Sequence, residues 1–155
     1  MTTKLELHTD VLVLGSGPSG FAAAYTAAKN GAKVILVEQG GDIGGSSTSV
    51  LMSHWTGSCG SPLFNEILKR SAENNEGEFK NKITNLIDPE KLKTLYLEML
   101  YEVGCKVMLY TFAEDAICDG DKVLGATVIN KSGKTDVYAK VTVDATGDGD
   151  IAARA

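Results

Sequence analysis

With 155 residues, the chain is long enough for one domain with a hydrophobic core, because a chain of this size buries roughly 70% of its unfolded surface. Apolar residues make up 43% of the chain and charged residues 23%, which is ordinary for a globular domain. The formal net charge of −5 argues against two classes of partner, nucleic acids and anionic membrane surfaces.

The first third of the chain predicts a βαβ unit. Val11–Leu14 is an uninterrupted apolar run, typical of a strand buried on both faces. The alanine-rich segment Phe21–Asn30 predicts a helix, and Gly31 follows it as a stop signal. Lys33–Val37 predicts a second buried strand, at the distance expected for a parallel crossover.

The middle of the chain predicts a loop and two helices. Gln39–Ser49 is rich in Gly and Ser and indicates a loop. Ser61 and Asp88 each precede a proline, which is typical of an N-cap and a first helical residue. The first helix should end near Ser71. The second carries one apolar stripe and ends before Gly104; the stripe consists of Leu92, Leu95, Tyr96, Met99, Leu100 and Val103.

The last third of the chain predicts strands. Three strand-like segments, residues 106–111, 123–130 and 137–145, are separated by turn signals at Asp119-Gly120 and Ser132-Gly133. We therefore expect an antiparallel β-meander. The complete pattern predicts one α/β domain over residues 1–155, a Rossmann-type parallel sheet with helices on both faces and an inserted meander.

The end of the chain predicts the start of a further helix. Asp150 resembles an N-cap, and residues 151–155 resemble a first helical turn. Because a single turn is costly to nucleate, we expect the natural domain to continue past Ala155 into a substrate domain that this chain lacks.

Three glycines lie between the first strand and the first helix in the pattern G-x-G-x-x-G. Gly15 permits a tight turn, Gly17 lets a pyrophosphate approach the backbone, and Gly20 lets the helix pack closely on the strand. The N-terminus of the helix offers free N–H groups and a partial positive charge to phosphate. Glu38, at the end of the second strand, predicts a carboxylate that accepts ribose hydroxyls and disfavours a 2′-phosphate. These residues predict a dinucleotide site and leave FAD and NAD both open.

Two further stretches carry a family resemblance. The first is Glu38–Thr48, an acidic residue followed by a loop that contains Gly44-Gly45, and the second is Val143–Asp150, which reads VDATGDGD. With these stretches the sequence resembles the FAD-dependent oxidoreductases whose FAD domain is like that of glutathione reductase. The resemblance covers nearly the whole chain and implies FAD as the cofactor, with hydride or electron transfer through its flavin.

The resemblance also implies which residues contact the cofactor. The pyrophosphate would lie against the turn formed by Gly15, Ser16, Gly17, Pro18, Ser19 and Gly20. Glu38 would hold the adenosine ribose with Gln39 beside it, and the backbone of Ala113 would contact adenine. The other implied contacts are Gly45, Ser46 and Ser47 along the pyrophosphate and ribityl chain, and Ala145, Thr146 and Gly147 in the turn that closes over the cofactor. Asp148 and Asp150 each either bind cofactor hydroxyls or serve as an N-cap.

One departure from the family pattern excludes a dithiol mechanism, because Ser47 and Met52 stand where the disulfide reductases of this superfamily carry their redox-active cysteine pair. His54 and Trp55 are candidates for a proton donor and a flavin-stacking ring, although structural roles are favoured. Cys59 is favoured as an inert thiol. The catalytic residues therefore stay unassigned, and no metal ligands are predicted.

Two alternative functions remain open: an NAD-dependent dehydrogenase fragment, and a non-catalytic nucleotide-binding module that needs a partner chain. We expect a small-molecule substrate, and self-association through apolar surface that a missing domain leaves exposed. The first ten residues lack the apolar core of a signal peptide, and no apolar run reaches the ~20 residues of a membrane span. The three cysteines form no C-x-x-C pair, which favours a cytoplasmic protein with reduced thiols.

Overall fold

The computed structural model describes residues 5–52, 54–56, 59–73 and 84–155. These residues form a six-stranded mixed sheet in the order β5-β2-β1-β8-β7-β6, and a separate two-stranded sheet of β3 and β4. The strands of the large sheet are β1 (Leu5–Leu14), β2 (Val34–Val37), β5 (Lys106–Met108), β6 (Phe112–Asp119), β7 (Lys122–Asn130) and β8 (Gly133–Asp144). The α/β class and the combination of a parallel sheet with an antiparallel meander are confirmed.

The strand β1 lies in the centre of the parallel part of the sheet. It pairs in parallel with β2, Leu14 opposite Val37, and with β8, Leu14 opposite Asp144. The strand β8 is also the last strand of the meander, since it pairs antiparallel with β7. Consequently β1, β2 and β8 all end at the same edge of the sheet, which is where open α/β sheets bind their ligands.

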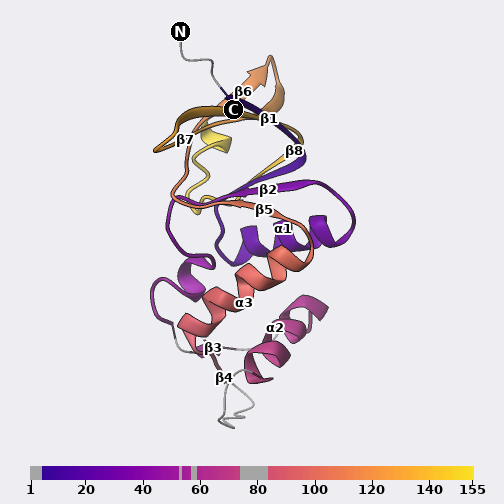
Figure 1. The fold of residues 1–155 in the computed structure, drawn as a ribbon, viewed down its shortest axis with the longest axis vertical. Helices are drawn as coiled ribbons and strands as arrows, with labels where there is room; N and C mark the ends of the chain where they lie inside the picture. The colour runs from indigo at the N-terminus through magenta and orange to yellow at the C-terminus, as the bar shows by residue number, and fades with distance from the viewer. Residues whose placement is uncertain (1–4, 53, 57–58, 74–83) are drawn as a thin grey trace.

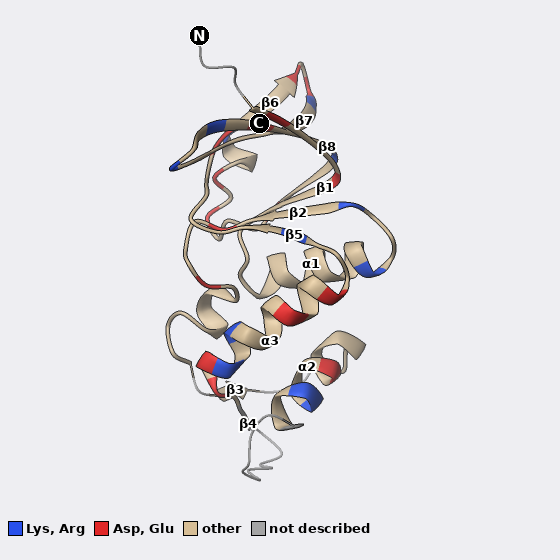
Figure 2. Cartoon of the chain, in the orientation of Figure 1, with Lys and Arg blue, Asp and Glu red and all other residues tan. Residues whose placement is uncertain are grey.

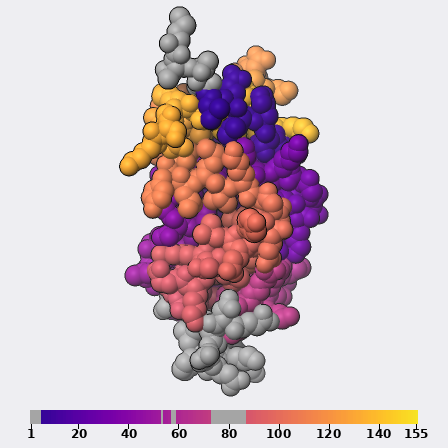
Figure 3. All heavy atoms as spheres, in the orientation of Figure 1, coloured from indigo at the N-terminus to yellow at the C-terminus, as the bar shows by residue number. Residues whose placement is uncertain are grey.

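Three helices cover one face of the sheet (Figure 1): α1 (Pro18–Lys29), α2 (Pro62–Glu73) and α3 (Pro89–Glu102). The predicted caps of α2 and α3 are confirmed: Ser61 and Asp88 accept hydrogen bonds from the first turns of α2 and α3, and Gly104, with a φ of 72°, follows α3. The helix α1 begins three residues before its predicted start at Phe21, and α2 ends two residues after Ser71. Their shared core includes Phe21 and Tyr96, whose ring centroids lie 3.9 Å apart. Figure 3 shows α3 and the segment after it across the middle of one side of the molecule.

The second face differs from the expected layer of helices. Its core joins Leu12 and Leu14 of β1 to Val128 of β7, Val137 of β8 and Ile151. In the described residues this face is therefore covered by the meander and by a short 3₁₀ helix, η2 (Ala152–Arg154), and carries no α-helix. The meander is joined to the parallel strands through the long strand β8, whose twelve residues pair with β1 along one side and with β7 along the other.

Several boundaries also differ from the predicted ones. The strand β1 begins at Leu5, because its polar first half pairs with β8. The predicted strand 106–111 is in fact β5 followed by a turn at Tyr110, whose φ is 49°. Three strands had no sequence prediction. The strand β6 is the first strand of the meander, a place that the prediction gave to residues 106–111, of which the first three form β5 and pair in parallel with β2. The strands β3 (His54–Thr56) and β4 (Thr84–Leu86) are too short to show alternation of their side chains.

Charged residues of both signs are interspersed along the helices (Figure 2). Glu66 of α2 pairs with Lys29 of α1 and with Arg70, and Arg70 pairs in turn with Glu102 of α3. This chain of ion pairs links the three helices at their exposed edges. No helix among the described residues has both the length and the apolar character that a bilayer crossing requires.

Candidate functional site

A cleft of about 360 Å³ lies at the edge of the sheet where β1, β2 and β8 end. Most residues that the resemblance implied line it: Gly15, Ser16, Gly17, Pro18, Ser19, Glu38, Gln39, Gly45, Ser46, Ala113, Ala145, Thr146 and Gly147. The structure thus brings together four segments that are far apart in the sequence. Their contact with a cofactor stays a prediction.

The turns after β1 and β8 touch each other on one side of this cleft. The Ala145 N–H donates a 2.8 Å hydrogen bond to the carbonyl of Leu14. Gly15 has a φ of 93°, and a Cβ added there would lie 2.3 Å from the Ala145 carbonyl oxygen. A Cβ on Gly20 would lie 1.9 Å from the Gly15 carbonyl oxygen. Gly20 does not line the cleft; it lies beneath the turn and permits the close packing of α1 on β1.

Gly17 borders open space, unlike the crowded Gly15 and Gly20. It is the N-cap of α1, no side chain caps the helix there, and a Cβ added to it would meet no heavy atom within 4 Å. Its φ of −58° is open to any residue. Space at the uncapped N-terminus of a helix suits an anion, because the first N–H groups are free and the helix dipole is positive there. The cleft therefore fits the diphosphate of a dinucleotide.

Glu38 connects the end of β2 to the glycine turn. Its Oε2 accepts hydrogen bonds from the Ser16 N–H at 2.9 Å and from the Ser16 hydroxyl at 2.5 Å. Its Oε1 accepts a 2.7 Å hydrogen bond from the Gly40 N–H. Ser16 is fully buried, whereas Glu38 is half-buried and faces the cleft. The carboxylate thus holds the turn and still presents lone pairs to hydroxyl groups of a ligand.

Asp144, which no sequence pattern singled out, holds the turn after β8 in shape. Its Oδ1 accepts from the N–H and the hydroxyl of Thr146, at 3.0 and 2.7 Å. Its Oδ2 accepts from the N–H groups of Ile151 and Ala152, at 3.0 and 2.7 Å. Partial burial opposes ionisation, but these hydrogen bonds, that from Ala152 first, outweigh it and lower the pKa of Asp144 below its ordinary value.

The assignment of an N-cap to Asp150 or Asp148 is wrong. The residue before η2 is Ile151, and its N–H and that of Ala152 are bonded by Asp144 instead. Asp150 lines the cleft, while Asp148 is exposed and does not line it. A carboxylate does bind the backbone N–H groups of this stretch, but it is that of Asp144, which accepts from Thr146 on one side of the turn and from Ile151 and Ala152 on the other.

The loop after β2 closes the other side of the cleft. The Gly44 N–H donates to the Ser16 carbonyl at 2.9 Å, and Gly45 and Ser46 line the cleft. Ser47 does not: it is buried, it hydrogen-bonds Tyr96, and it lines a second, apolar pocket. The 3₁₀ helix η1 (Gly45–Ser47) turns successive side chains to different sides, which explains the separation.

Three lining residues were not predicted, namely Val37, Thr111 and Phe112, whereas Asp150 was one of the two aspartates for which cofactor binding was left open. Thr111 is bonded to β2 through its N–H, which donates to the Glu38 carbonyl at 2.9 Å. Phe112 remains 47% exposed at the start of β6 and borders the cleft. The only sequence signal for Thr111 and Phe112 was their proximity to Ala113.

The aromatic candidates after the loop lie outside this cleft. Trp55 packs against Phe64 of α2, with ring centroids 5.8 Å apart, as the structural interpretation favoured. His54 is exposed on β3, and Cys59 is an exposed free thiol. Within the described ranges, no three His, Cys, Asp or Glu side chains are grouped so that they could hold a metal ion.

Comparisons with known proteins point in the same direction. A family model described as FAD dependent oxidoreductase matches residues 10–155. The chain is 28% identical to a digeranylgeranylglycerophospholipid reductase of Picrophilus torridus, over 92% of this chain and 40% of the relative. It is 31% identical to a thiamine thiazole synthase of Methanococcus aeolicus, over 92% of this chain and 56% of the relative. The crystal structure of Thermovibrio ammonificans THI4 matches with a TM-score of 0.73 and 27% identity, over 95% of this chain and 61% of that one. The chain thus spans about half the length of the curated relatives it matches.

Proposed function

Because this chain belongs to the FAD-dependent oxidoreductase family, we propose that it is the FAD-binding part of a flavin-dependent oxidoreductase. The observation that carries the proposal is the cleft in which Gly17, at the uncapped N-terminus of α1, faces the turn formed by Ala145 and Thr146. In the proposed complex, an extended dinucleotide would lie along the ends of β1, β2 and β8.

Each segment of the cleft has its own task in this proposal. The Ser19 N–H in the first turn of α1 binds a phosphate oxygen, aided by the dipole of the helix. Glu38 accepts hydrogen bonds from ribose hydroxyls. Gly45 has no side chain, so the loop leaves room for the ribityl chain to pass. When FAD is bound, its flavin supplies the hydride or electron transfer, and the protein supplies binding and orientation.

The family match supports FAD over the alternative cofactor NAD. A binding module that acts only with a partner chain remains the second candidate. The two relatives named above differ in their reactions, so we transfer neither substrate to this chain. A small-molecule substrate, self-association, the absence of nucleic-acid and membrane partners, and a cytoplasmic location all stay predictions.

The proposal is tested by binding. The 155-residue chain is titrated into FAD, and separately into NADH, and the fluorescence of each cofactor is recorded. We expect FAD to bind and to remain yellow on the protein after desalting, with NADH much weaker. Tight NADH binding without flavin uptake would support the dehydrogenase alternative, and binding of neither would refute the proposal for this chain.

Glu38→Ala is expected to weaken FAD binding at least about tenfold, because a hydrogen bond to a charged group contributes roughly 1.5–3 kcal/mol. FMN lacks the adenosine ribose, so its affinity should fall less than that of FAD. The comparison separates lost ribose contacts from damage to the glycine turn, which Glu38 also holds. Equal losses for FAD and FMN would show that Glu38 acts only through Ser16 and Gly40.

A further inference from the structure

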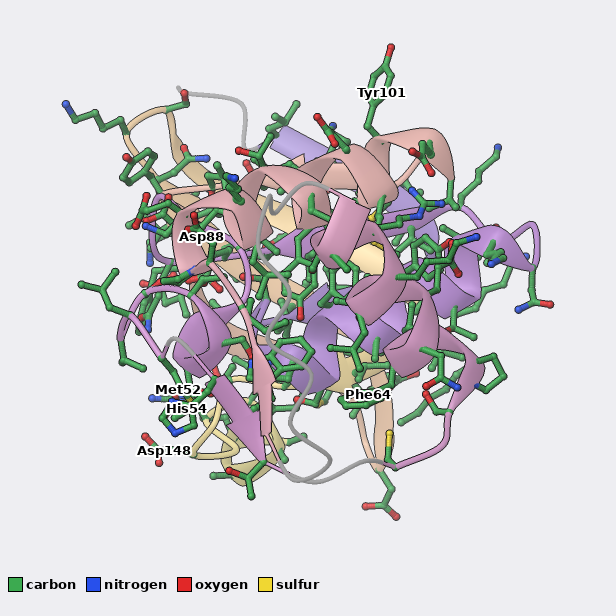
Figure 4. The ribbon with its side chains drawn as sticks, turned by 90° about the horizontal axis from the view of Figure 1, so that it is seen from below. Met52, His54, Phe64, Asp88, Tyr101 and Asp148 are labelled. Carbon is green, nitrogen blue, oxygen red and sulfur yellow. The ribbon has the colours of Figure 1, made fainter. Side chains whose placement is uncertain are left out.

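A second pocket, of about 340 Å³, lies among the helices on the other side of Pro18. Helices α1, α2 and α3, the strand β3 and the loop after η1 all contribute to its wall. Figure 4 looks onto this end of the molecule and labels two of the lining residues, Met52 and Phe64. The full lining is Pro18, Phe21, Ala22, Ser47, Met52, Trp55, Cys59, Ser61, Leu63, Phe64, Ile67 and Tyr96.

The chemistry of this lining is almost entirely apolar. No lining residue carries a formal charge at neutral pH, and four of them are aromatic. Tyr96 is fully buried, and burial raises the pKa of its hydroxyl despite the opposing hydrogen bond with Ser47. Its phenol therefore stays neutral. A charged ligand would lose its hydration here without gaining a partner of opposite charge, which is strongly unfavourable.

The pocket adjoins the cleft of the candidate site. Pro18 lines both of them, and the adjacent residues Ser46 and Ser47 line the cleft and the pocket respectively. A molecule in the pocket therefore lies one residue away from the segment along which the ribityl chain is proposed to run. The apolar lining and this position beside the cleft together indicate what occupies the pocket.

We propose that this pocket binds a neutral, predominantly hydrocarbon molecule beside the redox cofactor. Its volume falls in the range of roughly 300–1,000 Å³ that small-molecule pockets span, and such pockets are lined mainly by apolar and aromatic side chains. The Ser47 and Tyr96 hydroxyls, at the end nearer the cleft, suit a single hydroxyl or carbonyl oxygen on the ligand. That this ligand is the substrate of the enzyme rests on the proposed function. The binding of the ligand to the pocket does not depend on that function.

The chain contains a single tryptophan, Trp55, and it lines the pocket, so its fluorescence reports occupancy directly. Hexanol, octanol and decanol are titrated into the 155-residue chain. We expect a saturable blue shift and an affinity that rises about fourfold for each added CH₂ until the pocket is full. A shift that never saturates, or an affinity that rises without limit up to the solubility of the alcohol, would refute a pocket of fixed volume. No change in Trp55 emission would also refute the proposal.

A matched pair of variants on α1 locates the binding. Ala22 is half-buried and lines the pocket, so Ala22→Leu should fill part of it and lower octanol affinity at least about fivefold, consistent with the one or two CH₂ groups displaced. Thr26 is exposed one turn later and outside the lining, so Thr26→Leu should leave octanol affinity unchanged. Equal effects of the two variants would overturn the assignment. FAD affinity is measured in parallel: octanol binding without FAD binding rejects the proposed function alone, and FAD binding without octanol binding rejects this proposal alone.

Discussion

Gly20→Ala is expected to lower the thermal midpoint of unfolding by roughly 4–8 °C and to abolish measurable FAD binding. The added Cβ would lie 1.9 Å from the Gly15 carbonyl oxygen, a backbone atom that no side-chain rotation can move away. Overpacking of this kind costs about 3 kcal/mol, against a gain of about 1 kcal/mol for replacing glycine by alanine within a helix. The net loss of about 2 kcal/mol corresponds to that shift in a domain of this size.

Gly17→Ala is the matched control, because the same methyl group meets open space there. Its cost to stability should be below about 1 kcal/mol, the difference between glycine and alanine at an N-cap. FAD affinity should nevertheless fall at least tenfold, since the methyl group occupies the place where a diphosphate meets the backbone. Calorimetry and flavin titration together test both variants. If Gly17→Ala bound FAD as tightly as the parent chain, the phosphate would have to lie elsewhere.

Asp144→Asn is expected to destabilise the chain by about 2 kcal/mol and to weaken FAD binding about tenfold. The carboxylate accepts four hydrogen bonds, two on each oxygen, and an amide offers only one oxygen. Two donors would face the amide NH₂ group. Each lost hydrogen bond to a charged acceptor costs roughly 1.5–3 kcal/mol when the acceptor is buried. We expect a smaller loss of stability here, because Asp144 is half-exposed.

The pH dependence of this variant separates charge from shape. Because folding lowers the pKa of Asp144, its stabilising effect is present above the unfolded pKa of about 3.9 and is lost as the pH falls below that value. The stability difference between the parent and Asp144→Asn should therefore be full at neutral pH and narrow below about pH 4. Asp121→Asn, the same change in an exposed turn, is the control and should alter neither stability nor FAD affinity. A stability difference that did not change with pH would contradict a role for the charge.

The sequence predicted best those positions at which a residue type has one preferred backbone conformation or capping role. Gly31 and Gly104 adopt positive φ at helix ends, and Asp88 caps α3, as expected from local chemistry alone. The apolar runs of β1 and β2 became the centre of the sheet for the same reason. These signals are local, so they need no knowledge of the rest of the fold.

The positions that sequence missed depend on pairing between distant segments. The sequence does not show which of Asp144, Asp148 and Asp150 bonds the backbone of the turn. Only the fold of the turn brings the N–H groups of Ile151 and Ala152 within reach of Asp144. Thr111 reaches the cleft because its N–H donates to the carbonyl of Glu38, the residue after β2, which is far away in the sequence.

The sequence by itself determined the glycine turn between the first strand and the first helix and the carboxylate at the end of the second strand, because each has a local steric or electrostatic basis. That these two features and the Ala-Thr-Gly turn form one dinucleotide site is implied by the family resemblance and stays a prediction, and the structure brings their residues to one cleft. Only the tertiary structure decided that Asp144 holds the turn after β8, that Ser47 lines an apolar pocket, and that a meander covers the second face of the sheet. The physical reason is that these features follow from which atoms meet across long-range strand pairs, and the residue types at those positions permit more than one arrangement.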